Sequence, residues 1–183
     1  MKTIGLMIAK KDSNRLKDKN FKDFCGKPMF VWNLEKMLKI FDKVYVSSDH
    51  NFILKKAEEM GAIAIKRPAE LCGEVPNIPV YRHILENVEN VEIIVAVQAN
   101  SPTIKESLIK KAKDIMEKHD FEELLTCHYD FKPYGSIWAM TTKRLKNYDN
   151  FYKQIPQILL VDDSIDIHTE EDLGKAKNQY LSI

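Results

Sequence analysis

Glycine is scarce in this 183-residue sequence, and its six glycines stand apart from one another. The sequence therefore contains neither the Gly-x-Gly-x-x-Gly fingerprint of dinucleotide-binding folds nor the Gly-x-x-x-x-Gly-Lys-Ser/Thr loop of P-loop NTPases. Any phosphate-binding loop must then use lysine and arginine side chains, hydroxyls and backbone amides. This absence argues against a dehydrogenase or a P-loop enzyme.

Paired cysteines and long apolar runs are also missing. Cys25, Cys72 and Cys127 form no Cys-x-x-Cys pair, which argues against a disulfide framework and against a structural zinc site. No apolar run approaches the roughly 18 residues that span a bilayer, and the sequence does not open with a signal-peptide pattern. We therefore expect a cytoplasmic protein without a membrane segment, formed by a single domain over residues 1–183.

Strand-like and helix-like segments alternate along the chain, which predicts an α/β fold with a mostly parallel sheet. Strands are expected at residues 3–9, 43–47, 62–66, 93–98, 123–128, 136–141 and 158–161. Helices are expected at residues 28–40, 51–60, 80–88, 104–118 and 170–180. Pro28, Asp49 and Thr169 are helix-start signals, and Gly61 is a helix-end signal.

A cationic segment follows the first predicted strand. Between residues 10 and 27, seven lysine and arginine residues stand against three aspartates, whereas the formal net charge of the whole chain is +1. In a parallel sheet, the connection after a strand lies at the edge where ligands bind. A local positive excess on a balanced chain favours a small anionic ligand over nucleic acid, which needs a wider basic face. A solvated surface loop is the alternative interpretation.

An acidic segment lies near the other end of the sequence. Residues 162–172 contain six aspartates and glutamates and no lysine or arginine. Some of these carboxylates are placed to stabilise a helix N-terminus. Asp166 and His168 are two residues apart on a segment expected to be extended, so both side chains point to one face and can reach one metal ion, although Asp-x-His also arises by chance. A cationic loop with a carboxylate cluster suits metal-assisted chemistry on a polyphosphate.

Several longer motifs follow one another along the chain. In chain order they are Ala9-Lys10-Lys11-Asp12-Ser13-Asn14-Arg15-Leu16-Lys17-Asp18-Lys19-Asn20, Gly26-Lys27-Pro28, Val46-Ser47-Ser48-Asp49, Arg67-Pro68-Ala69-Glu70-Leu71, Gln98 with Ser101-Pro102, and Asp163-Ser164-Ile165-Asp166-Ile167-His168-Thr169-Glu170. In this order they resemble the motifs of the acylneuraminate cytidylyltransferase family, the CMP-sialic acid and CMP-Kdo synthetases. The resemblance implies a three-layer α/β/α, Rossmann-like nucleotidyltransferase fold. It also implies transfer of CMP from CTP to an acidic sugar, with release of pyrophosphate.

The resemblance implies roles for individual residues as well. The catalytic positive charge would come from Lys19, Arg15 and Lys10. The nucleotide would be bound by Ala9, Lys10, Ser13, Asn20 and Arg67. The substrate-binding positions are Gln98, Ser101 and Asp49, and the metal positions are Asp166 and His168.

Three departures from the family pattern shape the expectations. His168 replaces a second carboxylate, and imidazole is a poor ligand for Mg²⁺ but a better one for Mn²⁺ and softer ions. We expect Mg²⁺, with Mn²⁺ or another softer divalent ion as the alternative. Ile104 stands where the family has an arginine. Only nine residues separate Thr126 from Ser136, where these enzymes usually carry a long excursion that builds the dimer interface.

The expected partners are therefore CTP and an acidic sugar, with neither nucleic acid nor membrane. The short connection after Thr126 predicts a monomer or a non-standard homodimer. Two alternatives remain open from the sequence. One is a nucleotidyltransferase with another acceptor, such as a different sugar or a phosphonate, and the other is a catalytically degenerate nucleotide-binding protein.

Overall fold

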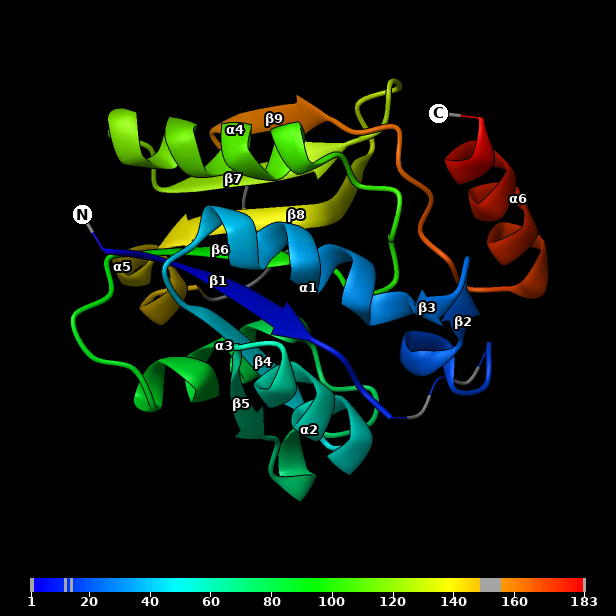
Figure 1. Cartoon of the computed structure of the whole chain (residues 1–183). Helices are drawn as coiled ribbons and strands as arrows, with labels where there is room; N and C mark the ends of the chain where they lie inside the picture. The colour runs from blue at the N-terminus through cyan, green and yellow to red at the C-terminus, as the bar shows by residue number, and fades with distance from the viewer. Residues whose placement is uncertain (1, 12, 14, 149–155, 183) are drawn as a thin grey trace.

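A seven-stranded sheet runs through the centre of the molecule (Figure 1). The computed structural model describes residues 2–11, 13, 15–148 and 156–182. In spatial order the strands are β5 (Ile63–Lys66), β4 (Val44–Ser48), β1 (Thr3–Ile8), β6 (Ile93–Val97), β8 (Pro133–Thr141), β7 (Glu123–Cys127) and β9 (Ile158–Val161). Strand β8 pairs antiparallel with both β6 and β7, whereas the other pairs are parallel. The predicted strands and the mostly parallel sheet are confirmed.

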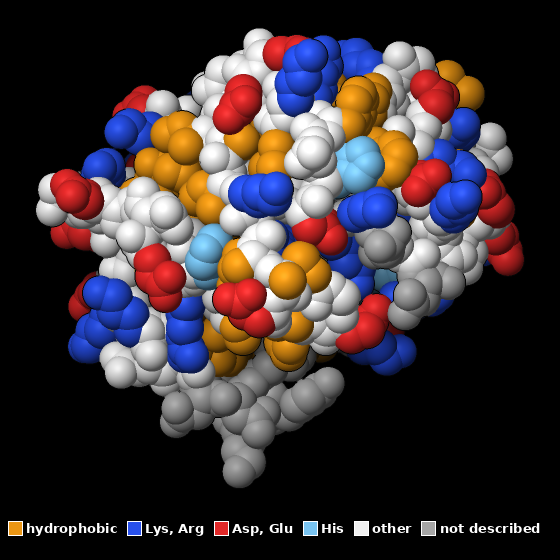
Figure 2. Space-filling view, turned by 90° about the horizontal axis from the view of Figure 1, so that it is seen from below, with side chains coloured by type: hydrophobic (Ala, Val, Ile, Leu, Met, Phe, Trp, Pro, Cys, Tyr) orange, Lys and Arg blue, Asp and Glu red, His pale blue; other side chains and the backbone are white. Residues whose placement is uncertain are grey.

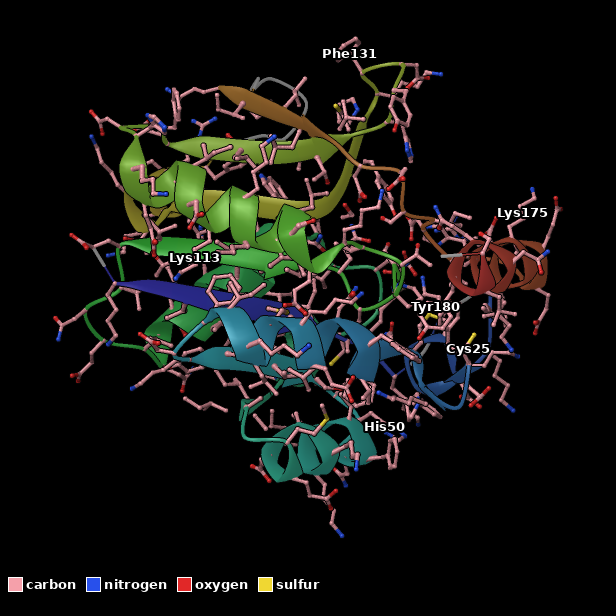
Figure 3. The ribbon with its side chains drawn as sticks, turned by 45° about the horizontal axis from the view of Figure 1, so that its top comes forward. Cys25, His50, Lys113, Phe131, Lys175 and Tyr180 are labelled. Atoms are coloured by element: carbon pink, nitrogen blue, oxygen red, sulfur yellow. The ribbon has the colours of Figure 1, made fainter. Side chains whose placement is uncertain are left out.

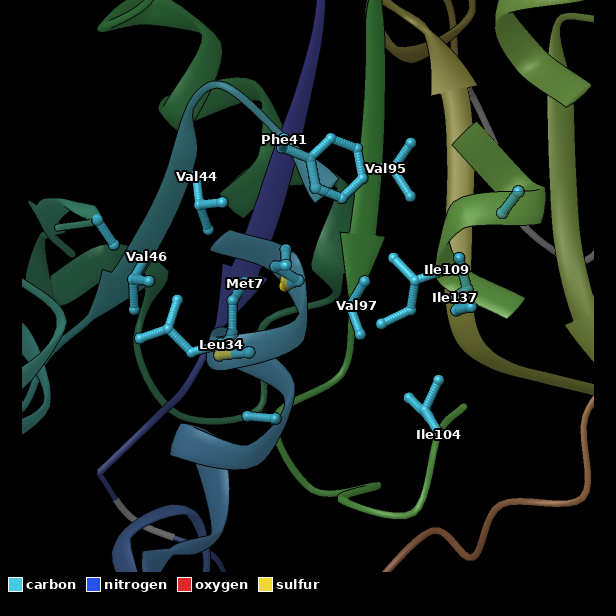
Figure 4. Close-up of a cluster of buried hydrophobic side chains, with 14 of the residues drawn as sticks. Met7, Leu34, Phe41, Val44, Val46, Val95, Val97, Ile104, Ile109 and Ile137 are labelled. Carbon is cyan, nitrogen blue, oxygen red and sulfur yellow. The ribbon is translucent and has the colours of Figure 1, made fainter. Parts of the chain in front are cut away.

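Helices cover both faces of this sheet, which gives the predicted three layers (Figure 1). One face carries α1 (Met29–Ile40), α2 (Asn51–Glu59) and α4 (Glu106–Lys118), and the other carries α3 (Asn77–Glu86) and the short α5 (Thr142–Lys146). Neighbouring strand residues point to opposite faces. Met7 therefore packs with Leu34 and Ile109 on the first face (Figure 4), while Leu6 packs with Tyr81 on the second.

A third, smaller cluster lies where the C-terminal helix α6 (Glu170–Leu181) packs against the hairpin of β2 (Asp23–Phe24) and β3 (Lys27–Pro28). Figure 3 shows Cys25 and Tyr180 side by side at this contact. The cluster buries Leu16 of the cationic segment and Ile167, which stands between Asp166 and His168. Apolar packing therefore brings the cationic and acidic segments to the same end of the molecule.

Several helix boundaries differ from the prediction. Helix α3 begins at Asn77 rather than at residue 80, and α4 begins at Glu106 rather than at residue 104. Pro28 has ψ of 136° and is the N-cap of α1, not its first helical residue. Thr169 is confirmed as an N-cap, in a reciprocal capping box with Asp172. Gly61 is confirmed just after α2, with φ of +95°.

Asp49 does not cap α2, contrary to the prediction. The N-cap residue is His50, which has no side-chain capping bond. The Oδ1 atom of Asp49 instead accepts a hydrogen bond from the backbone nitrogen of Lys11, at 2.6 Å. Within the described ranges, no helix is both long and apolar enough to cross a bilayer.

Candidate active site

A cavity opens at the carboxyl ends of β1 and β6. From β1 the chain proceeds to β4 and β5 and then returns to place β6 on the other side of β1. Such a reversal of strand order is where open α/β sheets bind ligands. The cavity has a volume of about 220 Å³, and it is lined by Ile8, Lys10, Lys19, Asn20, Arg67, Gly73, Val75, Asn77, Val80, Gln98, Asn100, Asp166 and His168.

Lys19, His168 and Asp166 form a hydrogen-bonded chain in this cavity. Lys19 lies on a short 3-10 helix, Lys19–Phe21, and is only 7% exposed. Its Nζ is 3.3 Å from Nδ1 of His168, whose Nε2 is 2.6 Å from Oδ2 of Asp166. Burial lowers the pKa of Lys19 to about 8; the Asp166 carboxylate opposes this shift, and Arg15 and Lys10 add to it.

Three cationic side chains line the cavity: Lys10, Lys19 and Arg67. Lys10 reaches across to Glu74, with 3.4 Å between Nζ and Oε1. Asn20 closes the cationic segment on itself by donating from Nδ2 to the carbonyl of Lys10 at 2.8 Å. Arg67 is 6% exposed and donates to the carbonyl of Ser47 at 2.9 Å, and burial lowers its pKa. Positive charge is thus held in a partly desolvated cavity, where it acts more strongly than in water.

Asn100 is a site residue that the sequence analysis missed. Its Nδ2 donates to Oδ1 of Asp166 and, at 3.2 Å, to the carbonyl of Ile167. The backbone nitrogen of Ile167 returns a bond to the carbonyl of Asn100 at 3.0 Å. Asn100 stands two residues after Gln98 at the carboxyl end of a predicted strand, and that position was the available signal. Ile8, Val75 and Val80, also not predicted, give the cavity an apolar wall.

Other predicted site residues lie outside the cavity lining. The side chain of Ala9 is fully buried in the core, and its assignment to nucleotide binding stays a prediction. Arg15 is exposed to solvent. Ser101 is fully buried, and its Oγ is 2.6 Å from the hydroxyl oxygen of Tyr134, so Ser101 contacts the protein and not the cavity.

Ser13 and Asp49 also make contacts within the protein. Ser13 accepts a hydrogen bond from the backbone nitrogen of Leu16 at 3.4 Å. Asp49 follows β4, on the opposite side of β1 from Gln98, and bonds to the backbone of Lys11. The sheet order separates Asp49 from Gln98, and the assignment of Asp49 to substrate binding stays a prediction. Asp12 and Asn14 of the first motif lie outside the described residues.

An ion pair joins the two oppositely charged segments. Nζ of Lys22 is 2.6 Å from Oε1 of Glu170, which begins α6. Elsewhere the surface mixes both signs, as the face in Figure 2 shows. This mixture is typical of a solvated surface. The cationic excess of residues 10–27 is thus partly balanced by tertiary contact.

The donor atoms at Asp166 fit a hard cation in part. Its carboxylate oxygens accept bonds from Asn100 and His168, but a carboxylate has about four lone-pair sites, so acceptor capacity remains. Mg²⁺ is commonly bound by one or two carboxylates together with substrate phosphates and water. Both ring nitrogens of His168 are already engaged. Within the part of the chain that the structure describes, no three His, Cys, Asp or Glu side chains gather as a metal cluster.

Comparison with known proteins decides the family. A family profile described as Cytidylyltransferase matches residues 4–162. The chain belongs to the cytidylyltransferase family. This membership confirms the resemblance drawn from the motifs. The acidic segment with Asp166 and His168 lies beyond the matched residues.

The curated relatives are longer proteins. This cytidylyltransferase is 29% identical over 145 residues to the Helicobacter pylori pseudaminic acid cytidylyltransferase and UDP-2,4-diacetamido-2,4,6-trideoxy-beta-L-altropyranose hydrolase, which covers 75% of this chain and 28% of that protein. It is 28% identical over 125 residues to the N-acylneuraminate cytidylyltransferase of Oncorhynchus mykiss, covering 67% of this chain and 29% of that protein. The chain therefore spans less than a third of the length of these relatives.

Solved structures confirm the fold. A CMP:2-keto-3-deoxy-manno-octonic acid synthetase complexed with CTP superposes with a TM-score of 0.80 and 16% identity, covering 100% of this chain and 99% of that one. Rv0371C of Mycobacterium tuberculosis H37Rv, in complex with manganese, gives a TM-score of 0.72 and 14% identity, covering 97% and 99%. The predicted Rossmann-like nucleotidyltransferase fold is confirmed.

Proposed function

We propose that this cytidylyltransferase transfers CMP from CTP to a hydroxyl group of an acidic sugar of the sialic acid or Kdo type, releasing pyrophosphate. The observation that carries the proposal is the convergence of Lys10, Lys19 and Arg67 on one cavity that Gln98 and Asn100 also line. Family membership supports the reaction class. The names of the relatives support the acceptor class.

Lys19 is the central residue of the proposed mechanism. The acceptor oxygen bonds to the α-phosphorus of CTP, the bond from that phosphorus to the leaving pyrophosphate breaks, and the hydroxyl proton is released. Charge on the phosphate oxygens is stabilised by fixed cations in a site of low dielectric. With a pKa of about 8, Lys19 carries its proton at neutral pH. Lys10 and Arg67 supply further positive charge, and exposed Arg15 acts from a greater distance.

Asp166 is the residue that would hold a divalent ion. Mg²⁺, or Mn²⁺ as a softer alternative, would neutralise charge on the triphosphate when bound. His168 is the second candidate ligand from the sequence. In the structure it orients Asp166 and Lys19 through its two ring nitrogens.

A different acceptor is the second candidate function, and Ile104 favours it. Its side chain is 1% exposed and packs in the core (Figure 4), so it offers no charge to an acceptor carboxylate. Asn100 and Gln98 instead present neutral amides to the cavity. Such groups suit the hydroxyls of another sugar as well as those of an acidic one.

We propose further that the protein is a monomer or a dimer built differently from its relatives. Residues 128–132 join β7 to β8 directly, and Phe131 stands exposed on this connection (Figure 3). Sedimentation of the purified protein across a concentration series tests this. If a dimer forms and cross-linking pairs residues 128–132 with each other, the proposal is wrong.

Pyrophosphate release tests the reaction itself. Each of the four ribonucleoside triphosphates is incubated with Mg²⁺ or Mn²⁺ and with sialic acid, Kdo or neutral hexoses. Release with CTP and one acidic sugar is the expected result. Release with CTP and a neutral sugar would replace the acceptor, and CTP binding by calorimetry without release would point to a non-catalytic binder. Failure to bind any nucleotide would contradict the proposal altogether.

A further inference from the structure

Helix α1 is hydrogen-bonded to the loop that follows β6 through the side chain of Asn33. Asn33 is fully buried, and its Nδ2 donates to the carbonyl of Gln98 at 2.8 Å and to the carbonyl of Ser101 at 2.8 Å. Residues 98–105 form this loop, between β6 and α4. One amide group therefore fixes two carbonyls of the segment that delivers Gln98 and Asn100 to the cavity.

Lys36, one helical turn later, adds hydrogen bonds to the same loop. Its Nζ donates to the carbonyl of Pro102 at 2.7 Å and to the carbonyl of Ile104 at 2.6 Å. A third bond, of 3.1 Å, goes to Oδ1 of Asn33. Residues three apart on a helix lie on one side of it. Because Lys36 occupies the oxygen of the Asn33 amide, the amide nitrogen must face the loop.

The other side of the same loop contacts the acidic segment and β8. Asn100 bonds to Asp166, and Oγ1 of Thr103 accepts from the backbone nitrogen of Ile165 at 3.2 Å. Gln98 donates from Nε2 to the carbonyl of Gly135 at 2.9 Å. The loop is therefore a rigid link between α1 and the carboxylate proposed to hold the metal.

Partial burial of the Lys36 ammonium is costly for folding. Burial lowers the pKa of Lys36 to about 8; Glu106, Asp162 and Glu35 oppose the shift, and Lys39 adds to it. An apolar side chain of similar volume at a buried charged position is often neutral or stabilising. A role in placing the loop gives a reason for the charge that folding stability does not.

We propose that Lys36 and Asn33 are positioning residues for the transfer reaction, holding the loop of residues 98–105 so that Gln98 and Asn100 face the acceptor in the cavity. This inference rests on the proposed function. Neither side chain lines the cavity. Because they hold the loop that carries Gln98 and Asn100, we expect their main effect on the acceptor side of the reaction.

Two variants separate the hydrogen bonds of Lys36 to the loop from those of Asn33. Lys36→Met keeps an unbranched side chain that is one atom shorter and removes the ammonium. Asn33→Asp keeps an acceptor for Lys36 and removes both donors to the loop. Lys39→Met is the matched control, because Lys39 lies on the same helix but pairs at the surface with Glu106, at 3.0 Å.

The measurements are kcat, KM for CTP, KM for whichever of sialic acid or Kdo supports release, the melting temperature, and amide hydrogen exchange of residues 98–105. We expect kcat/KM for the sugar to fall about 10- to 100-fold in both variants, as small displacements of reacting groups do. KM for CTP stays unchanged, exchange of the loop rises, and Lys39→Met behaves like the wild type.

Unchanged sugar kinetics in both variants would overturn the inference. So would equal losses for CTP and sugar together with a lower melting temperature, because those indicate a general structural role. If the wild-type protein releases no pyrophosphate, the proposed function fails. Amide exchange of residues 98–105 then tests by itself whether Asn33 and Lys36 hold the loop. Unchanged protection in both variants would overturn that inference.

Discussion

The two segments that border the cavity hold their functional side chains in different ways. After β1, Lys11, Arg15 and Lys17 are exposed to solvent. After β6, Ser101 is fully buried and Ile104 is 1% exposed, and the loop is bonded to α1, β8 and the acidic segment. Charge acts through space and tolerates imprecise placement. Attack by an acceptor hydroxyl needs near-contact geometry, and the bonded loop after β6 suits the acceptor side that is proposed for it.

Replacing Lys19 by alanine is expected to have the largest effect. Lys19 is buried, whereas its neighbours Arg15 and Lys17 on the same segment are exposed. We expect kcat to fall by about 10²- to 10³-fold, as when one preorganised charge-stabilising donor is removed. Pyrophosphate release measures the effect. Lys17→Ala, exposed on the same segment, is the control. Equal activity of the two variants would show that burial does not distinguish them.

Lys36 sharpens the comparison through the pH dependence of stability. Its folded-state pKa of about 8 lies below the ordinary value of 10.5. Between these pH values the unfolded chain binds more protons, so the free energy of unfolding rises with pH, by up to about 3 kcal/mol relative to Lys36→Met. Urea unfolding of both proteins across this range measures the difference. A constant difference would mean that Lys36 is not desolvated.

Asp166→Asn tests the carboxylate that the rigid loop holds. We expect binding of Mn²⁺ to the CTP complex, followed by electron paramagnetic resonance, to weaken about 10- to 100-fold. Asp163→Asn is the control, because Asp163 pairs with Lys105 at 2.7 Å and does not line the cavity. Equal Mn²⁺ affinity of Asp166→Asn and the wild type would remove Asp166 from the metal site.

Arg15→Ala is expected to have the smallest effect. An exposed cation contributes roughly 0.2–1 kcal/mol, and salt screens it. KM for CTP should therefore rise about two- to fivefold at low salt and less at high salt. A large loss that persists at high salt would show that Arg15 contacts the nucleotide directly, and the contrast between the two segments would then be wrong.

Local patterns carried most of the fold and part of the site. Apolar runs of strand length marked every strand of the central sheet, and Thr169 and Gly61 marked helix ends through their own backbone chemistry. The cationic segment lies at the carboxyl edge of the sheet as expected, because it follows a parallel strand, and Lys10 and Lys19 line the cavity there. Asp49 was misjudged, since its position before a helix suited a cap while its carboxylate bonds a backbone amide far away in the sequence.

The sequence by itself determined the α/β class through its alternating segments and the two oppositely charged segments through its composition, and its ordered motifs carried the resemblance to the family. Only the tertiary structure decided which lysines are buried and bonded to the protein and which face solvent. Lys36 and Lys39 stand on one helix and are alike in sequence, yet the loop after β6 covers only Lys36. Burial and hydrogen-bond partners depend on how distant segments pack, and residue order along the chain does not contain that information in readable form.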